Sequence, residues 1–491
     1  MDQNTHSCNF SQKAKSGCRR SLAAISALCL VFFARTPLSY ADPSPNLPAQ
    51  QPKTDYRSIK LDNFPRDANG YLKVEVWKLI EEYAKTNPNT NEARSVTRRA
   101  EGIQYLAKYA GWVAPQPPAP PSGKLRNLAE KPVKPRFLLT GKSWPRQGGE
   151  ASVCLWEDDK LAAMSLGIDD NCSGDVEFWK GLSKKYGQLN ITWNLVVKGI
   201  DTGKEANAGT WNFWRALTKE GYHVASHSVT HCSDPVPADG WLGYDWEASE
   251  SKRLMDANLD GFVTKVFVYP GAGVGAFATP RKHVEIYRQA AGKYYAAARG
   301  GGAFGINQAN MIDYLDIHST TGGVESLLSD TPNPAWMADQ KIKNLFDPNN
   351  KCYRGWANIF IHFINQGKDF DTNPYDIAYG KLLAFYNDHR EDLWTGFFDD
   401  VALYGQERDT ATLVTDEASS RKIALTLTSR MDPSVFNYPL TVKVRLYDTW
   451  RSITATQDGN VLPVQMIEYE DHAYALVKAA PDRGQVILMP K

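Results

Sequence analysis

Hydrophobic residues in the middle of the chain form short runs that alternate with segments of helical spacing. Apolar runs of strand length occur at 160–168, 189–197, 222–227, 265–270, 294–299 and 358–364. Helical spacing occurs at 212–221, 247–261 and 378–394. Strands buried on both faces of a parallel sheet consist of continuous apolar runs. The alternation therefore predicts a parallel sheet with helices outside it, either open or closed into a barrel.

The pattern changes towards both ends of the chain. Residues 71–85 and 91–112 have apolar positions at helical spacing, which predicts a small helical segment. Beyond about 410, short alternating runs rich in β-branched residues are separated by turn residues, including Asp458–Gly459. This texture predicts an antiparallel β-sandwich. The stretch "APQPPAPPSG" at 114–123 has five prolines in ten residues, which favours a semi-rigid spacer.

The first forty residues resemble an export signal. A basic region with Lys13, Lys15, Arg19 and Arg20 precedes the apolar stretch 21–34, and "SYA" ends just before Asp42. The apolar stretch is too short to span a bilayer, so we expect a removed signal peptide, a secreted or periplasmic protein, and no transmembrane segment in the mature chain. A retained N-terminal anchor is the alternative.

These observations predict five parts. They are a signal peptide (1–41), a helical N-terminal segment (42–113), a Pro-rich linker (114–149), a central α/β domain (150–408) and a C-terminal β-sandwich (409–491). The chain has 56 basic and 55 acidic residues, a formal net charge of +1, which argues against nucleic acid as a partner. Four cysteines follow the signal and allow three pairings: Cys154, Cys172, Cys232 and Cys352.

Candidate chemistry gathers where two predicted strands end. Asp169 and Asp170 follow the strand at 160–168, and His227 and His231 lie at and beyond the end of the strand at 222–227. Parallel strands bring their carboxyl ends to one edge. Taken separately, the aspartates fit a turn or helix cap and the histidines a capped helix start. Together they form a ligand set suited to catalytic Zn²⁺, in which one carboxylate binds the metal and its neighbour accepts a proton.

The order of these motifs resembles the polysaccharide deacetylases, the NodB-homology group called carbohydrate esterase family four. The resemblance covers about 150–405 and is most specific in "SHSVTH" at 226–231. It implies a distorted, incomplete (β/α) barrel that removes N- or O-acetyl groups from polysaccharides with one divalent metal. The central domain would then be the catalytic one.

The resemblance also implies roles for single residues. Asp170, His227 and His231 would be the metal ligands and Asp169 the general base. His362, in "IFIHFIN", would be the general acid. In "VFVYPGAG", Tyr269 and Pro270 would line the substrate groove.

Three departures from the family pattern concern the surroundings of the base. The usual Asp-Asp-Gly is Asp169-Asp170-Asn171 here, preceded by Ile168 where the family usually has Phe. No arginine stands before Tyr269, although the family's groove motif normally begins with one that orients the base. The family also has a motif after the groove strand that supplies an Asp and a Trp. Asp313 and Asp316 are the candidates for its aspartate.

Two further predictions concern neighbouring side chains. Cys172 and Cys232 each follow a predicted ligand closely, so we predict a disulfide between them, with two buried thiols as the alternative. Trp241 and Trp246, in and just after a Gly-containing loop, are predicted to contact substrate, although tryptophan more commonly lies in a core.

The sequence thus predicts an exported deacetylase with an acetylated polysaccharide as substrate and one divalent metal, most suitably Zn²⁺. One alternative is a metal-dependent hydrolase of another C–N or ester bond on the same barrel. Another is a carbohydrate-binding protein whose barrel has lost catalysis, which the missing arginine suggests.

Overall fold

A computed structural model describes residues 66, 68, 72–86, 112–187, 189–203, 207–231, 242–270, 281–300, 306–320, 342–362 and 374–491. They fall into two compact units, and helix α2 (Val74–Thr86) belongs to the first. This helix confirms the one predicted at 71–85, and it buries Val76, Ile80 and Tyr83. The expected signal peptide lies outside the described residues, as does the second predicted helix apart from Trp112.

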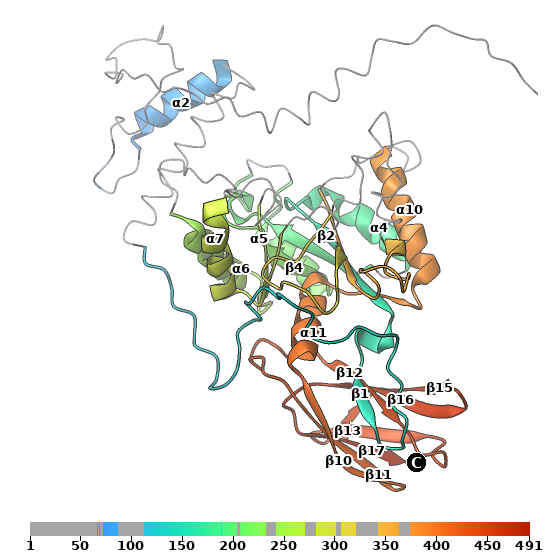
Figure 1. The fold of residues 1–491 in the computed structure, drawn as a ribbon. Helices are drawn as coiled ribbons and strands as arrows, with labels where there is room; N and C mark the ends of the chain where they lie inside the picture. Colours follow the sequence, from blue (N-terminus) through green and yellow to red (C-terminus); the bar gives the residue numbers. More distant parts are fainter. Residues whose placement is uncertain are drawn as a thin grey trace, which may run out of the picture. The chain divides into compact units, whose positions relative to one another are not determined.

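The second unit contains a curled, mainly parallel sheet (Figure 1). Its strand order is β6-β5-β4-β3-β2-β8-β7, with β7 antiparallel to β8 and β9 beside the first half of β2. All residues of β2 and β3 are buried, which explains their continuous apolar sequences. The strands are β2 (Ala162–Ile168), β3 (Ile191–Leu195), β4 (His223–Ser226), β5 (Val266–Val268), β6 (Ala297–Arg299), β7 (Ile306–Asn307), β8 (Trp356–Ile361) and β9 (Leu393–Thr395).

Irregular backbone links the sheet's first strand, β6, to β8. Ile317 forms a parallel bridge with Arg299 of β6, and Thr320 forms one with Ile359 of β8. The amide of Gly300 also donates to the carbonyl of Ile317. The regular strands therefore form a half-barrel rather than a complete barrel, and this segment lies across the gap.

Helices cover the outside of the sheet, as the alternating pattern predicts (Figure 1). In α5, Thr210 caps the N-terminus by accepting from the amide of Phe213, and Trp214 and Leu217 are buried. The helices are α4 (Val176–Tyr186), α5 (Trp211–Lys219), α6 (Tyr244–Asn258), α7 (Arg281–Tyr294), α10 (Pro374–His389) and α11 (Phe398–Thr410). Short 3-10 helices are η4 (Glu157–Asp159), η5 (Ser173–Asp175) and η6 (Val197–Gly199).

Two antiparallel sheets form the predicted β-sandwich, ordered β1-β12-β16-β15 and β10-β11-β17-β13-β14. Strand β1 (Ala151–Val153) lies within the predicted central domain, yet Val153 pairs with Val442 of β12. The half-barrel is therefore inserted between two strands of the sandwich. The other strands are β10 (Thr412–Ser419), β11 (Lys422–Thr428), β12 (Leu440–Arg445), β13 (Ile453–Gln457), β14 (Asn460–Leu462), β15 (Val464–Tyr469), β16 (His472–Ala479) and β17 (Gln485–Pro490).

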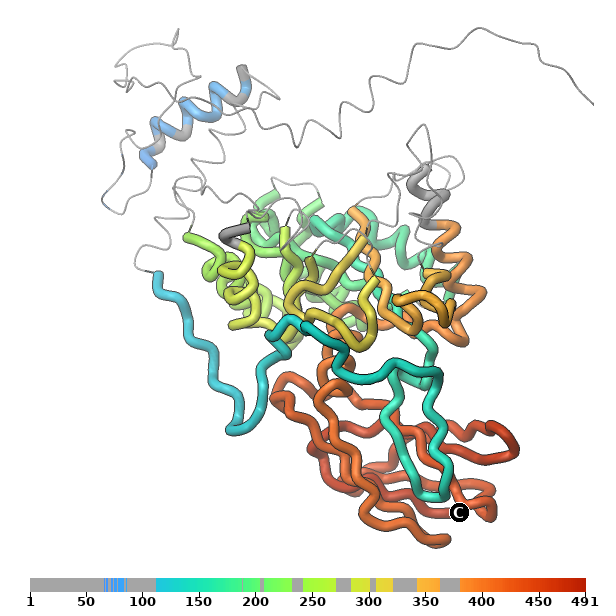
Figure 2. The backbone as a smooth tube through the Cα atoms, in the orientation of Figure 1, coloured from blue at the N-terminus to red at the C-terminus, as the bar shows by residue number. Residues whose placement is uncertain are grey.

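The stretch 112–150, most of which we predicted to be a spacer, has contacts with both the half-barrel and the sandwich. The amide of Leu125 donates to the carbonyl of Arg430 at 2.8 Å, and Asn127 Nδ2 donates to the carbonyls of Gly292 and Tyr295. Figure 2 shows this stretch in cyan and teal, passing the sheet before it enters β1. It fastens the two parts to each other.

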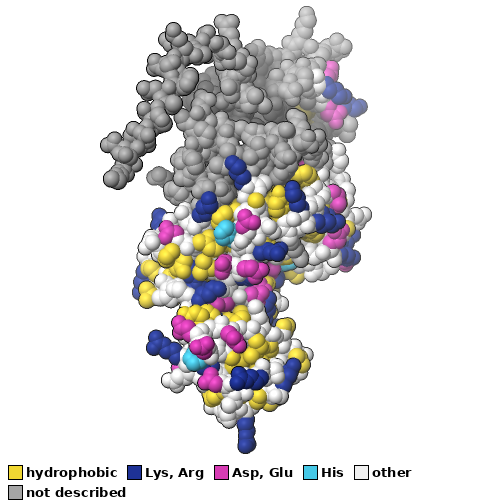
Figure 3. Space-filling model, turned by 90° about the vertical axis from the view of Figure 1, so that its right-hand side faces the viewer, with side chains coloured by type: hydrophobic (Ala, Val, Ile, Leu, Met, Phe, Trp, Pro, Cys, Tyr) yellow, Lys and Arg dark blue, Asp and Glu magenta, His cyan; other side chains and the backbone are white. Residues whose placement is uncertain are grey.

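The visible surface carries both signs of charge. Figure 3 shows basic and acidic side chains intermixed over the coloured part of that face, in keeping with the near-zero net charge. Among the residues that the structure describes, no helix has the length and apolar character needed to cross a bilayer.

Candidate metal centre

The predicted ligands lie together at the carboxyl-terminal edge of the sheet. Asp170 follows β2 and His227 follows β4, with His231 four residues further on. The Nε2 atoms of His227 and His231 lie 3.5 Å and 3.3 Å from Asp170 Oδ1. His362, which follows β8, places its Nε2 at 4.0 Å from Asp170 Oδ2. The folded chain thus assembles the four side chains that the sequence pattern brought forward.

The three residues Asp170, His227 and His231 fit a metal ion. One ligand atom from each lies within 4.8 Å of the other two. Ligands of tetrahedral Zn²⁺, each about 2.0–2.1 Å from the metal, lie roughly 3.3 Å from one another, close to the two spacings given above. Asp170 Oδ1 is buried and has no hydrogen-bond partner in the described structure. A cation between these groups would satisfy that oxygen.

His227 is held in the form that binds metals. Its Nδ1 lies 2.9 Å from the carbonyl oxygen of Val268, and donation there leaves the Nε2 lone pair facing Asp170. Burial lowers the pKa of His227 to about 4, against the opposing charge of Asp169. The imidazole is therefore neutral at pH 7, as metal binding requires.

Asp169 is fixed by two neighbouring strands. Arg299 Nη1 and Nη2, from β6, donate to its two carboxylate oxygens at 2.9 Å and 2.5 Å, and Asn194 Nδ2, from β3, donates to Oδ1 at 2.6 Å. Burial alone would raise the pKa of Asp169, but the charge and hydrogen bond of Arg299, together with the charges of His227 and His362, outweigh burial and hold the pKa well below its usual range. A Cβ on Gly167 would lie 2.9 Å from Asn194 Nδ2, so glycine leaves room for this arrangement.

A run of left-handed residues follows Asp169. Asp170, Asn171 and Cys172 have φ values of 57°, 64° and 43°. Asparagine is among the few residues other than glycine that adopt this region readily, so Asn171 is a fitting replacement for the family's glycine. Its side chain also accepts from the amide of Val196 and donates to the carbonyl of Ala208. The departure from Asp-Asp-Gly therefore preserves the turn.

The loop that carries the two histidines also contains residues with left-handed backbone. Ser228 and His231 have φ values of 70° and 57°. Glu247 of α6, which is fully buried, accepts from the amides of Val229 and Thr230 at 2.8 Å and 2.9 Å. Strained backbone of this kind persists where the surroundings fix it, and Glu247 supplies that restraint.

Sequence reasoning missed Arg299, Asn194 and Glu247. We looked for an arginine just before Tyr269, whereas the structure supplies one from the next strand. The segment "YYAAAR" indicated Arg299, because it places a charged residue at the carboxyl end of a buried strand. Binding residues of parallel sheets gather at that end. Asp313, a candidate for the later motif, instead accepts from Arg288 at 2.7 Å.

Several predicted contacts do not fit the structure. Tyr269 and Trp246 are each 1% exposed, and Tyr269 donates to the carbonyl of Leu315, so neither ring offers a face to substrate. Pro270, which follows Tyr269 in sequence, is also buried. Trp241 lies outside the described residues. Both rings were assigned from motif position, which does not say which way a side chain points.

The predicted disulfide is absent at Cys172, which is a free thiol. The Cys172 Sγ is buried and donates to the carbonyl of His362 at 2.6 Å. Its would-be partner, Cys232, lies outside the described part of the chain. The buried-thiol alternative describes Cys172.

Comparison with known proteins adds one relative of substantial identity. No family model matches the chain. A gellan lyase from a Bacillus species is 32% identical over 454 residues, which cover 90% of this chain and 16% of the relative. The chain thus spans less than a fifth of the length of that relative.

Similar solved structures include a CE4 family protein and a deacetylase. A mutant CE4 family pseudoenzyme with restored enzymatic activity is 14% identical, covers 49% of this chain and 68% of its own, and has a TM-score of 0.31. The Streptococcus pyogenes deacetylase PplD in complex with acetate is 19% identical, covers 31% and 61%, and has a TM-score of 0.24. An ER glucosidase II complex is 8% identical, with 69% and 62% covered and a TM-score of 0.28. These scores are too low to carry an argument.

Proposed function

We propose that this protein is a metal-dependent hydrolase that removes acetyl groups from an extracellular or periplasmic polysaccharide. The observation that carries the proposal is the convergence of Asp170, His227 and His231, with their ligand atoms within 4.8 Å, beside a carboxylate held by Arg299. The resemblance of these motifs to polysaccharide deacetylases supports the reaction class.

Asp170, His227 and His231 would hold the divalent cation, most suitably Zn²⁺. Such a cation, when bound, supplies Lewis acidity that makes water a better nucleophile and a carbonyl a better electrophile. Three protein ligands leave a position open, which is typical of catalytic rather than structural zinc sites.

Two further side chains would move protons. Asp169 accepts a proton from the attacking water, and the guanidinium of Arg299 keeps it ionised and in one orientation. His362 is 41% exposed on its side chain and gives a proton to the departing sugar oxygen or nitrogen. The products are acetate and a sugar with a free hydroxyl or amine.

The polysaccharide itself is a separate question. The relative of 32% identity is named as a gellan lyase, so gellan belongs in any panel of substrates. The three ligands, with the carboxylate of Asp169 beside them, fit a hydrolysis reaction. We therefore propose hydrolysis rather than a lyase reaction for this site. Gellan is therefore proposed as one polysaccharide to test, with deacylation as the reaction.

The test is acetate release from acylated gellan, acetylated xylan and a chitin oligosaccharide, with and without chelator and added Zn²⁺. Wild-type protein should release acetate from at least one of them, lose activity to chelator and regain it with metal. Asp169→Asn should retain about one equivalent of metal and lose about 100-fold or more in kcat, whereas His227→Ala should lose metal and activity together.

Other outcomes point to the alternatives. Bound metal without acetate release would favour a hydrolase of another C–N or ester bond. No bound metal, together with retained affinity for a glycan, would favour a carbohydrate-binding protein. Equal activity in Asp169→Asn and wild type would refute the assignment of the base.

A further inference from the structure

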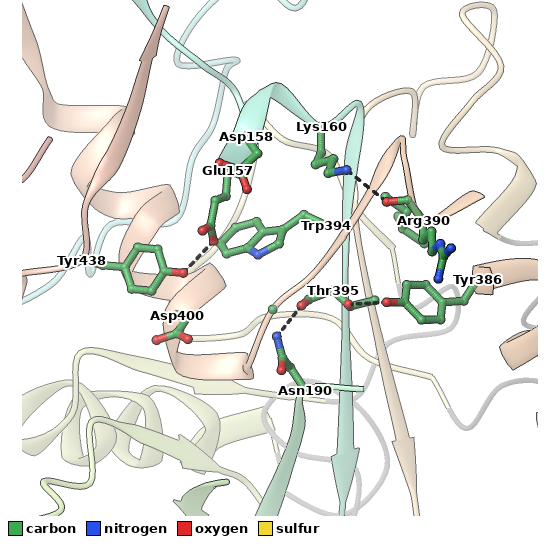
Figure 4. Close-up of a pocket in the computed structure, with 12 residues that line it drawn as sticks. Glu157, Asp158, Lys160, Asn190, Tyr386, Arg390, Trp394, Thr395, Asp400 and Tyr438 are labelled. Atoms are coloured by element: carbon green, nitrogen blue, oxygen red, sulfur yellow. Dashed lines mark hydrogen bonds between the residues drawn. The ribbon is translucent and has the colours of Figure 1, made fainter. Parts of the chain in front are cut away.

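A pocket lies at the opposite end of β2 from Asp169, where the half-barrel meets the sandwich. Its volume is about 270 Å³. We call it the seam pocket, and Figure 4 shows most of its lining. It is lined by Glu157, Asp158, Lys160, Asn190, Tyr386, Arg390, Leu393, Trp394, Thr395, Gly396, Asp400 and Tyr438.

The seam pocket is separated from the metal centre by the length of a strand. Trp394 in its wall pairs with Ala163, near the start of β2, whereas Asp169 follows the end of that strand. At about 3.3 Å per residue, these positions are roughly 20 Å apart. A ligand in the seam pocket would therefore not touch the proposed catalytic residues.

Aromatic rings and hydrogen-bonding groups line the pocket together. Figure 4 shows the Trp394 ring among carboxylates and an amide, with Tyr386 and Tyr438 on either side. Tyr438 donates to Glu157 at 2.6 Å, and Tyr386 accepts from Thr395 Oγ1 at 3.1 Å. Trp394 and Tyr386 are only 8% and 6% exposed, so the pocket presents mainly polar groups to a ligand, and these suit the hydroxyl groups of sugars.

Two charged side chains in the lining have no partner of their own. The carboxylate of Asp400 and the guanidinium of Arg390 make no hydrogen bond to any described residue. Asp400 is half-buried, and burial followed by the charge of Asp399 raises its pKa to about 7. A polar ligand with several hydroxyls would give both groups partners, and hydrogen bonds to charged groups are the stronger kind.

A second cavity adjoins the first and extends the possible contact. It has a volume of about 280 Å³ and shares Asp158 and Lys160 with the seam pocket. Trp144 lines it, stacked on Tyr469 with centroids 4.0 Å apart. Two neighbouring cavities that share part of their lining fit consecutive residues of a chain better than one compact small molecule.

A metal ion is a weaker candidate for this region. His223, Asp399 and Asp400 have ligand atoms within 4.8 Å of one another. However, His223 Nδ1 already bonds Asp399 Oδ1 at 2.7 Å. Both aspartates also lie in the first turn of α11, where the helix dipole favours carboxylates and disfavours a cation.

We propose that the seam pocket is a carbohydrate-binding site, which holds a residue of a polysaccharide chain by hydrogen bonds to Asp400, Arg390 and Asn190. Its occupant is a glycan segment, and the adjoining cavity takes the next residue. The inference stands independently of the reaction proposed for the metal centre, since it uses none of those residues.

The test is native electrophoresis of the full chain in gels containing gellan, xylan or glycol chitin. Asp400→Asn combined with Arg390→Ala should raise the dissociation constant about tenfold in the gel that retards the wild type. The matched control is Asp458→Asn combined with Arg421→Ala, which makes the same two chemical changes at exposed positions of the sandwich. The control should bind like the wild type.

Each outcome bears on the proposal. Equal retardation of the Asp400/Arg390 variant and the wild type would overturn it, as would the absence of retardation in all three gels. Loss of retardation in His227→Ala alone would assign the affinity to the metal centre instead. If the double variant unfolds, Arg390→Ala alone decides, because this exposed guanidinium makes no hydrogen bond or ion pair to a described residue, and a threefold weaker binding is expected.

Acetate release separates this inference from the proposed reaction. The Asp400/Arg390 variant should release acetate from a short acetylated oligosaccharide within twofold of the wild-type rate. A wild-type protein that binds glycan but releases no acetate would refute the reaction and leave the seam pocket standing.

Discussion

The two ends of the half-barrel differ in how their polar groups are satisfied. At the carboxyl-terminal edge of the sheet, which we call the rim, Asp170 Oδ1 is buried without a partner among the described residues. Asp170 and His231 both have left-handed φ values. At the seam, Glu157 is bonded to Tyr438 and also contacts Lys478, although the neighbouring Asp158 has a left-handed φ of 51°. The polar groups at the rim are thus placed to bind a group from outside the chain, such as a metal ion. Many polar groups at the seam are instead paired with other side chains of the protein. The two ends are therefore distinguished by the cluster of Asp170, His227 and His231 around an unpartnered oxygen, and not by strain alone.

Removing the guanidinium from Arg299 should have the largest effect. Arg299→Met leaves Asp169 buried with only Asn194 as a side-chain partner, so kcat should fall about 100-fold. The pKa of Asp169 should rise, because the charge of Arg299, which is the largest of the causes that oppose burial, is lost together with its hydrogen bond. The acid limb of the pH–rate profile should therefore move to higher pH, and Arg299→Lys should restore part of the rate.

The chain provides a matched control for this prediction. Arg288 forms a similar buried pair with Asp313, at 2.7 Å, and makes no hydrogen bond to Asp169, His362 or the three proposed metal ligands. Arg288→Met should lower the melting temperature without moving the pH profile. A shift of the profile in both variants would mean that Arg299 acts only through stability.

The next effect concerns a buried carboxyl of α11 near the seam. Glu407 is 1% exposed and its Oε2 lacks a partner, and burial raises its pKa from the ordinary 4.5 to about 8 although the amide of Tyr438 opposes this. Between these values the folded state binds more protons than the unfolded state. The free energy of unfolding therefore falls as pH rises through this interval.

Glu407→Gln should remove that pH dependence. The loss in unfolding free energy between pH 6 and pH 8 should be smaller in the variant by about 2 kcal/mol, measured by urea denaturation. Acetate release should keep its pH profile, because Glu407 lies away from the rim. An unchanged slope of stability against pH in the variant would show that Glu407 is ionised in the folded protein.

The smallest expected effect tests the left-handed turn at the rim. Asn171→Ala and Asn171→Gly both lose the side-chain hydrogen bonds to Val196 and Ala208, but only alanine is strained at a φ of 64°. The glycine variant should be more stable than the alanine variant by about 1 kcal/mol in thermal or urea unfolding. Equal stabilities would mean that the turn relaxes on substitution.

The strands were predictable because burial on both faces leaves a plain signature. The run at 160–168 contains β2, and the run at 222–227 contains β4, so the placement of Asp170 and His227 at one edge followed from the rule for parallel strands. The sandwich strands with alternating burial, such as β13, were also visible in the sequence.

Other features depended on tertiary contacts that a single sequence does not show. Strand β10 has mostly exposed side chains, so its apolar signal is weak. Arg299 reaches Asp169 across the sheet from 130 positions away in sequence. Trp246 and Tyr269 looked like substrate contacts from their motifs, and only the packing of the helices shows that they are core residues.

The pairing of β1 with β12 has a consequence for how the protein is made. During synthesis Val153 leaves the ribosome long before Val442, the residue it pairs with. At about 5–20 residues per second, the first strand waits roughly 15 to 60 s for its neighbour. For that interval the first strand stays unpaired while the inner domain is being synthesised, so a chaperone that shields short exposed strands would act on it then.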